Sequence, residues 1–148
     1  MAKIRVEGLD ELIIDMESAA MMPDEVYLAM VDAKADVFEP RLKSAAESML
    51  SGPRSKGITA KSIKRRNRRK TKYGAKIEVF PDGDRPGGGN KKKGKNTRRI
   101  AEVAFINEYG ARGVPPRPFM RATAETSADA TAAAAYDVFD KFLKSKNL

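Results

Sequence analysis

The sequence predicts an α+β fold, in which a small, mostly antiparallel sheet is packed by a long N-terminal helix and a C-terminal helix. Long stretches near both ends carry apolar residues at helical spacing, and shorter segments alternate apolar and polar residues. The 148 residues are enough for one compact domain, expected to span 1–148. A hydrophobic content of 41% argues against a fully disordered chain.

Three helices are expected, over residues 9–20, 24–50 and 119–145. The first shows an apolar stripe at Leu9, Leu12, Ile13 and Met16. Pro40 lies inside the second helix and predicts a kink or a division there, because proline removes a backbone donor and clashes with the preceding turn. The third helix opens at Phe119 and ends among lysines, which suit a helix C-terminus.

Three strands are expected, over residues 3–7, 75–80 and 99–106. The last two are expected to pair as a hairpin. Residues 85–96 between them are rich in Gly and Lys and offer nothing to a core, so we expect a long, flexible, basic loop at the hairpin tip.

The residue types that are missing limit the chemistry. The chain has no Cys and no His, which excludes disulfides and Cys-ligated metals and removes the commonest general base. Glu78, Asp82 and Asp84 with Lys76 suggest at most a weak metal-nuclease cluster, because acids that flank Gly83 are typical turn formers. We expect no enzyme activity, no catalytic or metal site, no cofactor and no small-molecule partner.

The N-terminal residues do not read as a signal peptide, since no apolar region follows them. No apolar stretch in the sequence reaches the length of a membrane span. We therefore expect a protein that is made in a cytoplasm and has no membrane partner.

Positive charge is concentrated in one part of the chain. The net charge is +9, yet residues 54–99 hold 18 Lys and Arg against three acids, while the remainder holds 11 basic and 17 acidic residues. The candidate partner-facing or DNA-facing residues of this segment are Lys61, Lys64, Arg65, Arg66, Arg68, Arg69, Lys70, Lys91, Lys92, Lys93 and Lys95.

Such a segment fits three descriptions: a grip on nucleic-acid phosphates, a contact with an acidic protein, or a solvated surface. Tyr73 is the one aromatic near the basic run, so a site that stacks bases has weak support.

Residues 104–110, Ala-Phe-Ile-Asn-Glu-Tyr-Gly, followed by Val-Pro-Pro-Arg-Pro-Phe-Met-Arg-Ala at 114–122, form a recognisable pattern. The pattern resembles the "gene product ten" family of neck and tail-component proteins of tailed bacteriophages. The opening at residues 6–12 and the Gly-Ile-Thr-Ala-Lys-Ser-Ile stretch at 57–63 are similar to that family in the same order. Two departures are the long basic stretch at 85–96 and Ala111, where the family usually has Thr.

The resemblance implies a structural virion subunit in the neck or upper tail, made in the bacterial host cytoplasm, that acts in neck or tail completion or as a tail terminator. It would form a ring, with six-fold or twelve-fold symmetry, and join the DNA-filled head to the tail. Its partners would be head-closure or connector proteins and tail-tube proteins, with passing double-stranded DNA as a further contact. The alternative is a basic nucleic-acid-binding protein that grips phosphates through residues 54–99.

The motif residues that carry the resemblance are Glu108, Tyr109, Gly110, Arg117, Pro118 and Phe119. Gly110 is expected at positive φ, because it follows an aromatic residue and precedes a turn. Glu108 is expected either to pair with Arg112 or Arg117, or with a neighbouring subunit's Arg, or to be solvated. Phe119 is expected in the core, with a subunit interface as the alternative.

Overall fold

A computed structural model describes residues 22–51, 57–86 and 97–146. Its elements are α2 (Asp24–Met49), α3 (Ile58–Lys61), β1 (Ile63–Thr71), β2 (Gly74–Pro81), β3 (Asp84–Pro86), β4 (Thr97–Arg99), α4 (Ile100–Tyr109) and α5 (Phe119–Ser145). The α+β class is confirmed, with a long helix near each end of the chain. The predicted strand at 3–7 and helix at 9–20 lie outside the described residues.

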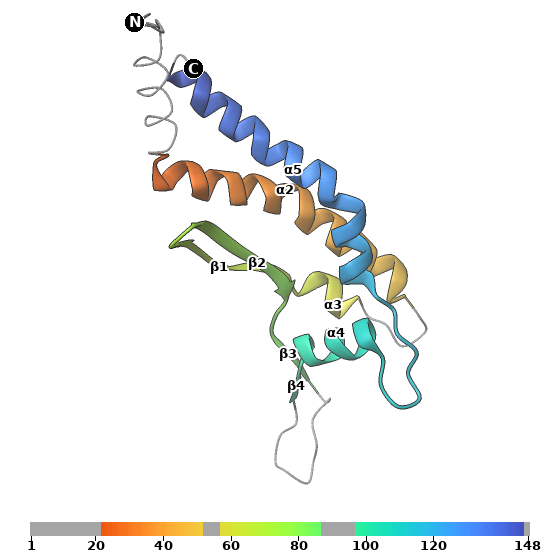
Figure 1. Ribbon diagram of the computed structural model, residues 1–148. Helices are drawn as coiled ribbons and strands as arrows, with labels where there is room; N and C mark the ends of the chain where they lie inside the picture. The colour runs from red at the N-terminus through yellow and green to blue at the C-terminus, as the bar shows by residue number, and fades with distance from the viewer. Residues whose placement is uncertain (1–21, 52–56, 87–96, 147–148) are drawn as a thin grey trace, which may run out of the picture.

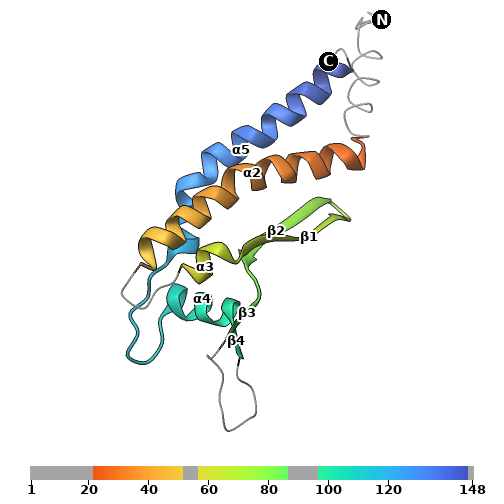
Figure 2. The ribbon, with the colours of Figure 1, turned by 180° about the vertical axis from the view of Figure 1, so that it is seen from behind.

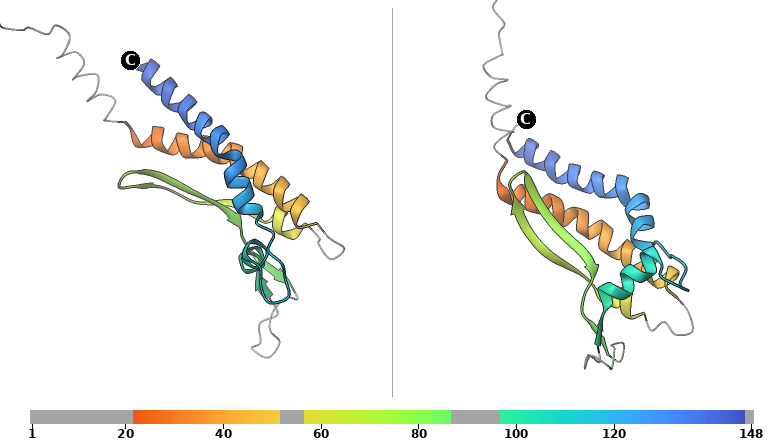
Figure 3. Two further views of the ribbon diagram at one scale, coloured as in Figure 1. Left: turned by 45° about the vertical axis from the view of Figure 1, so that its right-hand side comes forward. Right: turned by 60° about the horizontal axis from the view of Figure 1, so that its bottom comes forward.

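Helix α2 is the central layer, with α5 on one side and the β1–β2 hairpin on the other (Figures 1 and 3). Its 26 residues make a rod of about 39 Å. Pro40 does not divide the helix, which bends along its length in Figure 1. The predicted helices at 24–50 and 119–145 are confirmed within one residue. No helix in the described ranges is both long and apolar enough to cross a bilayer.

The pairing predicted for the sheet is wrong. Strand β2 matches the strand expected at 75–80, but its antiparallel partner is β1, formed by the basic run that precedes it. The register runs from Ile63 opposite Pro81 to Thr71 opposite Gly74, so only two residues connect the strands. A strand that precedes β2 by a two-residue connection forms a local hairpin, whereas residues 99–106 are some 20 residues away.

Residues 100–106 form a helix, not the predicted strand. In α4, Ile100, Ala104 and Glu108 are buried at intervals of four residues, while Glu102 is exposed, which fits a helix and not the two-residue alternation of a strand. Only Thr97–Arg99 are extended, and they pair as β4 with β3. Arg85 and Pro86, expected in the loop, belong to β3, and the rest of that loop lies outside the described residues.

The buried core lies where the C-terminal half of α2 meets α3, β1, α4 and the start of α5. Its buried residues are Leu42, Ala46, Ala60, Ile63, Ala104 and Phe119. Phe119 is fully buried and is among the largest of the fully buried side chains, so the core placement predicted for it is confirmed.

We expect Phe119→Ala to lower the free energy of unfolding by about 3–5 kcal/mol, because it removes buried apolar surface and leaves a cavity. Tyr136→Ala is the matched control, since Tyr136 lies on the same helix and is 69% exposed. Urea unfolding of both variants measures the difference. Equal losses in the two variants would contradict this description of the core.

Candidate functional site

The basic run lies on a strand that is packed along a helix. Lys61 ends α3, and the cations from Lys64 to Lys70 lie on β1. Ile63, at the start of β1, is buried and anchors the strand in the core. The direction of each cation therefore follows from the two-residue alternation of the strand.

A bulge at Asn67 changes that alternation. Arg66 lies opposite Glu78 and Arg69 opposite Lys76, so β1 has one extra residue between these two pairs. Asn67 has φ of 54°, in the left-handed region that Asn tolerates better than most residues. As a result the side chains of Arg65 and Arg68, three positions apart, both reach α2.

Three cations of β1 form ion pairs with carboxylates of α2, and we call them the α2-facing set: Arg65, Arg68 and Lys70. The contacts are Arg65 to Asp36 at 2.7 Å and to Glu39 at 2.5 Å, Arg68 to Asp32 at 2.7 Å, and Lys70 to Asp24 at 2.5 Å. Arg68 presents both Nε and Nη2 to the Asp32 carboxylate, the two-point geometry that guanidinium groups favour. These contacts fix the hairpin against α2.

The remaining cations of the run point elsewhere, and we call them the outer set: Lys61, Lys64, Arg66 and Arg69. Arg66 pairs with Asp82. Lys61, Lys64 and Arg69 make no ion pair within the described ranges. Another molecule can therefore bind these three exposed cations without breaking an ion pair seen in the described ranges. Lys91, Lys92, Lys93 and Lys95 lie outside the described residues.

Glu39 of α2 forms ion pairs with two cations, Lys43 on the same helix and Arg65 on β1. Hydrogen bonds first from Lys43 and then from Arg65 hold the pKa of Glu39 below its ordinary value of 4.5. The same carboxylate and Asp36 raise the pKa of Arg65. These pairs are half-buried or exposed, so each stabilises the fold by no more than about 1 kcal/mol.

The motif around Glu108 forms a structural joint between α4 and α5. Glu108 is 6% exposed, and its two carboxylate oxygens accept hydrogen bonds from the backbone N–H groups of Met120 and Arg121, each at 2.9 Å. These are the second and third residues of α5, whose amides have no partner within the helix. Pro118 precedes α5 and makes no side-chain cap, so Glu108 supplies the cap from another helix.

Glu108 therefore contacts backbone amides of α5 instead of an arginine side chain. Neither Arg112 nor Arg117 pairs with it, and both lie exposed in the connector. A buried carboxylate is stabilised here by two amides and by the positive end of the α5 dipole. The sequence left Glu108 open between a pair with an Arg and a solvated position, and did not predict its contact with the first amides of α5.

The connector between α4 and α5 is a closed turn. Gly110 has φ of 79°, as predicted, and a Cβ there would lie 3.0 Å from the Val114 carbonyl oxygen and 3.2 Å from Pro116. Ala111 and Val114 exchange backbone hydrogen bonds of 3.0 and 2.8 Å. The glycine is required both by its φ and by the close approach of the returning chain.

The joint leaves an aromatic pair exposed on α4. The rings of Phe105 and Tyr109 lie 4.7 Å apart between centroids, and the residues are 63% and 61% exposed. Ala101 precedes them on the same stripe and is also exposed, and Val114 of the connector is 41% exposed. Phe105 was not among the predicted site residues; its four-residue spacing from Tyr109 would have indicated this stripe if the segment had been read as a helix.

The acids considered for a metal-nuclease cluster are spread over separate contacts. Asp82 binds Arg66, and Glu78 binds Lys76 at 2.7 Å and also accepts a hydrogen bond from Asn67. In the part of the chain that the structure describes, no three acidic side chains are arranged to hold a metal ion.

No protein-family model, curated protein or solved structure matches this chain. The family resemblance drawn from the motif residues therefore stays a prediction.

We expect Glu108→Ala to destabilise the fold by about 1–3 kcal/mol, because it leaves two helix amides without an acceptor. Glu108→Gln, which keeps one acceptor oxygen, should cost less. The matched control is Glu125→Ala, which removes an exposed carboxylate from α5. Urea unfolding measures all three, and a Glu108→Ala loss no larger than that of the control would exclude the cap.

Glu39 predicts a pH dependence of stability. Its pKa is lower in the folded state than the ordinary 4.5, so the unfolded chain binds more protons between these values. The contribution of Glu39 to the free energy of unfolding is present above about pH 4.5 and is lost as pH falls through its folded-state pKa. Glu39→Gln should flatten the fall in unfolding free energy below pH 5, which urea unfolding over a pH series measures. If the unfolding free energies of wild type and Glu39→Gln fell in parallel below pH 5, this assignment to Glu39 would be wrong.

Proposed function

We propose that this chain is a structural subunit of a tailed-phage virion, which assembles as a ring at the head–tail junction and joins the DNA-filled head to the tail. The observation that supports it best is the joint between α4 and α5. The motif residues that resemble the phage family form one connected unit, in which Glu108 caps α5, Gly110 permits the turn and Phe119 enters the core.

The joint presents a surface suited to contact between subunits. A helix that is apolar on most sides is normally covered, yet α4 leaves Ala101, Phe105 and Tyr109 exposed along one stripe. A shallow groove lined by Arg99, Ala101, Glu102, Phe105 and Ile106 runs beside it. Aromatic residues with Arg nearby are typical of the central contacts of interfaces. The occupant in this proposal is a second copy of the chain, in the head-to-tail contact that generates rings.

The outer set of cations has a second place in the same assembly. Three exposed cations without an intramolecular partner in the described part suit an acidic surface of a neighbouring ring, either a head-closure or connector protein or a tail-tube protein. This proposal includes no enzyme activity, cofactor, membrane or small molecule.

A nucleic-acid-binding protein is the second candidate, favoured by the same outer set. Lys61, Lys64 and Arg69 are exposed and able to neutralise phosphates. It ranks second because the α2-facing set, a large share of the basic run, is already bound by carboxylates of α2.

We expect the double variant Phe105→Ser and Tyr109→Ser to abolish self-assembly while keeping the fold, because both rings are exposed in the single chain. Sedimentation velocity over a concentration series should show a ring for wild type and a monomer for the variant. Tyr136→Ser is the matched control and should assemble as wild type does. A wild type that stays monomeric at the highest concentration, or a double variant that still forms rings, would contradict the proposal.

A further inference from the structure

The N-terminal half of α2 is poorly covered for its composition. The buried residues of α2 are Ala35, Leu42 and Ala46, so none lies in its first eleven positions. That part nevertheless carries Val26, Leu28 and Met30, all half-buried. Figure 2 shows the start of α2 and the end of α5 drawing apart at this end of the molecule, away from the core.

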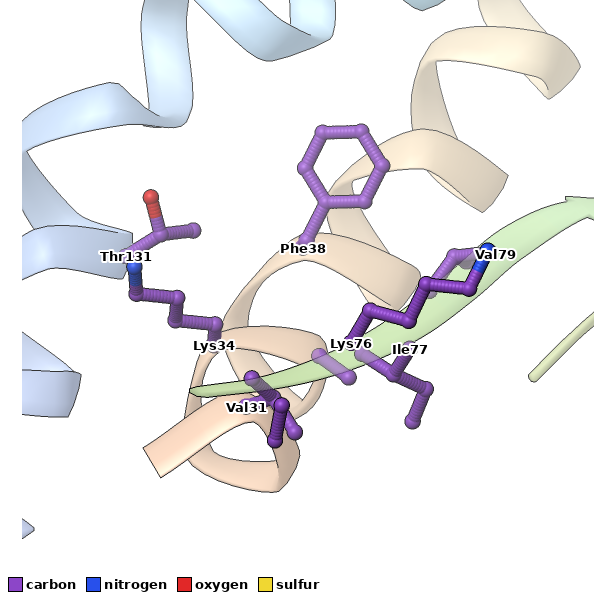
Figure 4. Close-up of a pocket in the computed structure, with 9 residues that line it drawn as sticks. Val31, Lys34, Phe38, Lys76, Ile77, Val79 and Thr131 are labelled. Atoms are coloured by element: carbon purple, nitrogen blue, oxygen red, sulfur yellow. The ribbon is translucent and has the colours of Figure 1, made fainter. Parts of the chain in front are cut away.

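An open groove of about 390 Å³ lies along this part of α2, between the helix, β2 and α5 (Figure 4). Val31 and Phe38 of α2 and Ile77 and Val79 of β2 line it, and all four are only half-buried. Lys34 is exposed beside the groove. An apolar groove with a cation at its side fits an amphipathic segment that carries acidic residues.

The chain itself contains such a segment. Residues 1–21 lie outside the described part of the structure, so the occupant is inferred from their sequence. Leu9, Leu12, Ile13 and Met16 share one helical face, and residues 6–22 contain five acids and no Lys or Arg. Segment and groove are therefore complementary in both polarity and charge.

We propose that residues 9–20 of the same chain occupy this groove. Only three residues separate their end from the start of α2, and so short a connection makes neighbouring helices antiparallel. With the turn at about residue 22, positions 9–16 fall opposite roughly 28–35 of α2, on the 1.5 Å rise of both helices. This range includes Val31 and Lys34 of the groove. The inference stands apart from the proposed function, since it concerns how one chain completes its own packing.

Disulfide trapping tests the arrangement directly, because the natural chain has no Cys. Four double variants combine Val31→Cys with Cys at position 9, 12, 13 or 16. We expect a disulfide within the chain in at least one of them, seen as a faster-migrating monomer on a non-reducing gel, since bonding requires Cα atoms within about 7 Å. Four control variants use Glu47→Cys, which is exposed and about 24 Å further along α2, and should form none.

A Val31 series with no intrachain bond, or a Glu47 series that bonds equally fast, would overturn the proposal. Bonds only between chains would overturn it as well and would assign the groove to the segment of a neighbouring copy. Hydrogen exchange gives an independent measurement on the full chain. Val31→Glu, which places a like charge in the groove, should speed exchange in residues 9–20 by about tenfold, whereas Lys144→Glu at the exposed end of α5 should not. Equal exchange in these two variants would contradict the docking.

Discussion

The ion pairs between β1 and α2 are the constraint on which the arrangement of the hairpin depends. A strand with unbroken alternation would send Arg65 and Arg68 to opposite faces, and the extra residue at Asn67 brings both to the helix. Each pair alone contributes little, but together they set the register of hairpin and helix. A segment that reads as a solvated basic tract is thereby turned into a packed element of the fold.

At the joint between α4 and α5, a single buried side chain has a comparable role. Glu108 joins α4 to α5 by satisfying amides that Pro118 leaves without a cap, and its burial holds α4 in the orientation that exposes Phe105 and Tyr109. The proposed subunit contact and the stability of the fold therefore share one joint. A variant that loosens the joint would also disturb assembly, so the aromatic residues, whose side chains project away from the core, separate the two effects.

Much of the fold could be predicted from the sequence, because the long helices and β2 have clear periodicity. The strand read at 99–106 failed, since a short apolar run fits a helix or a strand equally well until its partners are known. Tertiary contacts show that the segment is a helix: Ile100 and Ala104 are buried while Glu102 between them is exposed, and in a strand all three would share one face. The basic run was predicted to contain contact residues. Its division into the α2-facing set and the outer set depends on the bulge at Asn67, which the local sequence pattern does not predict. Glu108 was recognised as a motif residue without its partner, because the amides that it caps belong to another helix.

A titration of the purified chain with duplex DNA, at low salt and at about 0.15 M salt, tests the central claim that the basic run serves the fold and protein contacts. With the α2-facing set already bound by carboxylates, few phosphates can be neutralised, so the dependence of binding on salt should be shallow. Binding should be weak already at low salt and undetectable at physiological salt. Tight binding by the monomer at physiological salt, with a steep salt dependence, would contradict the account and favour a nucleic-acid-binding protein.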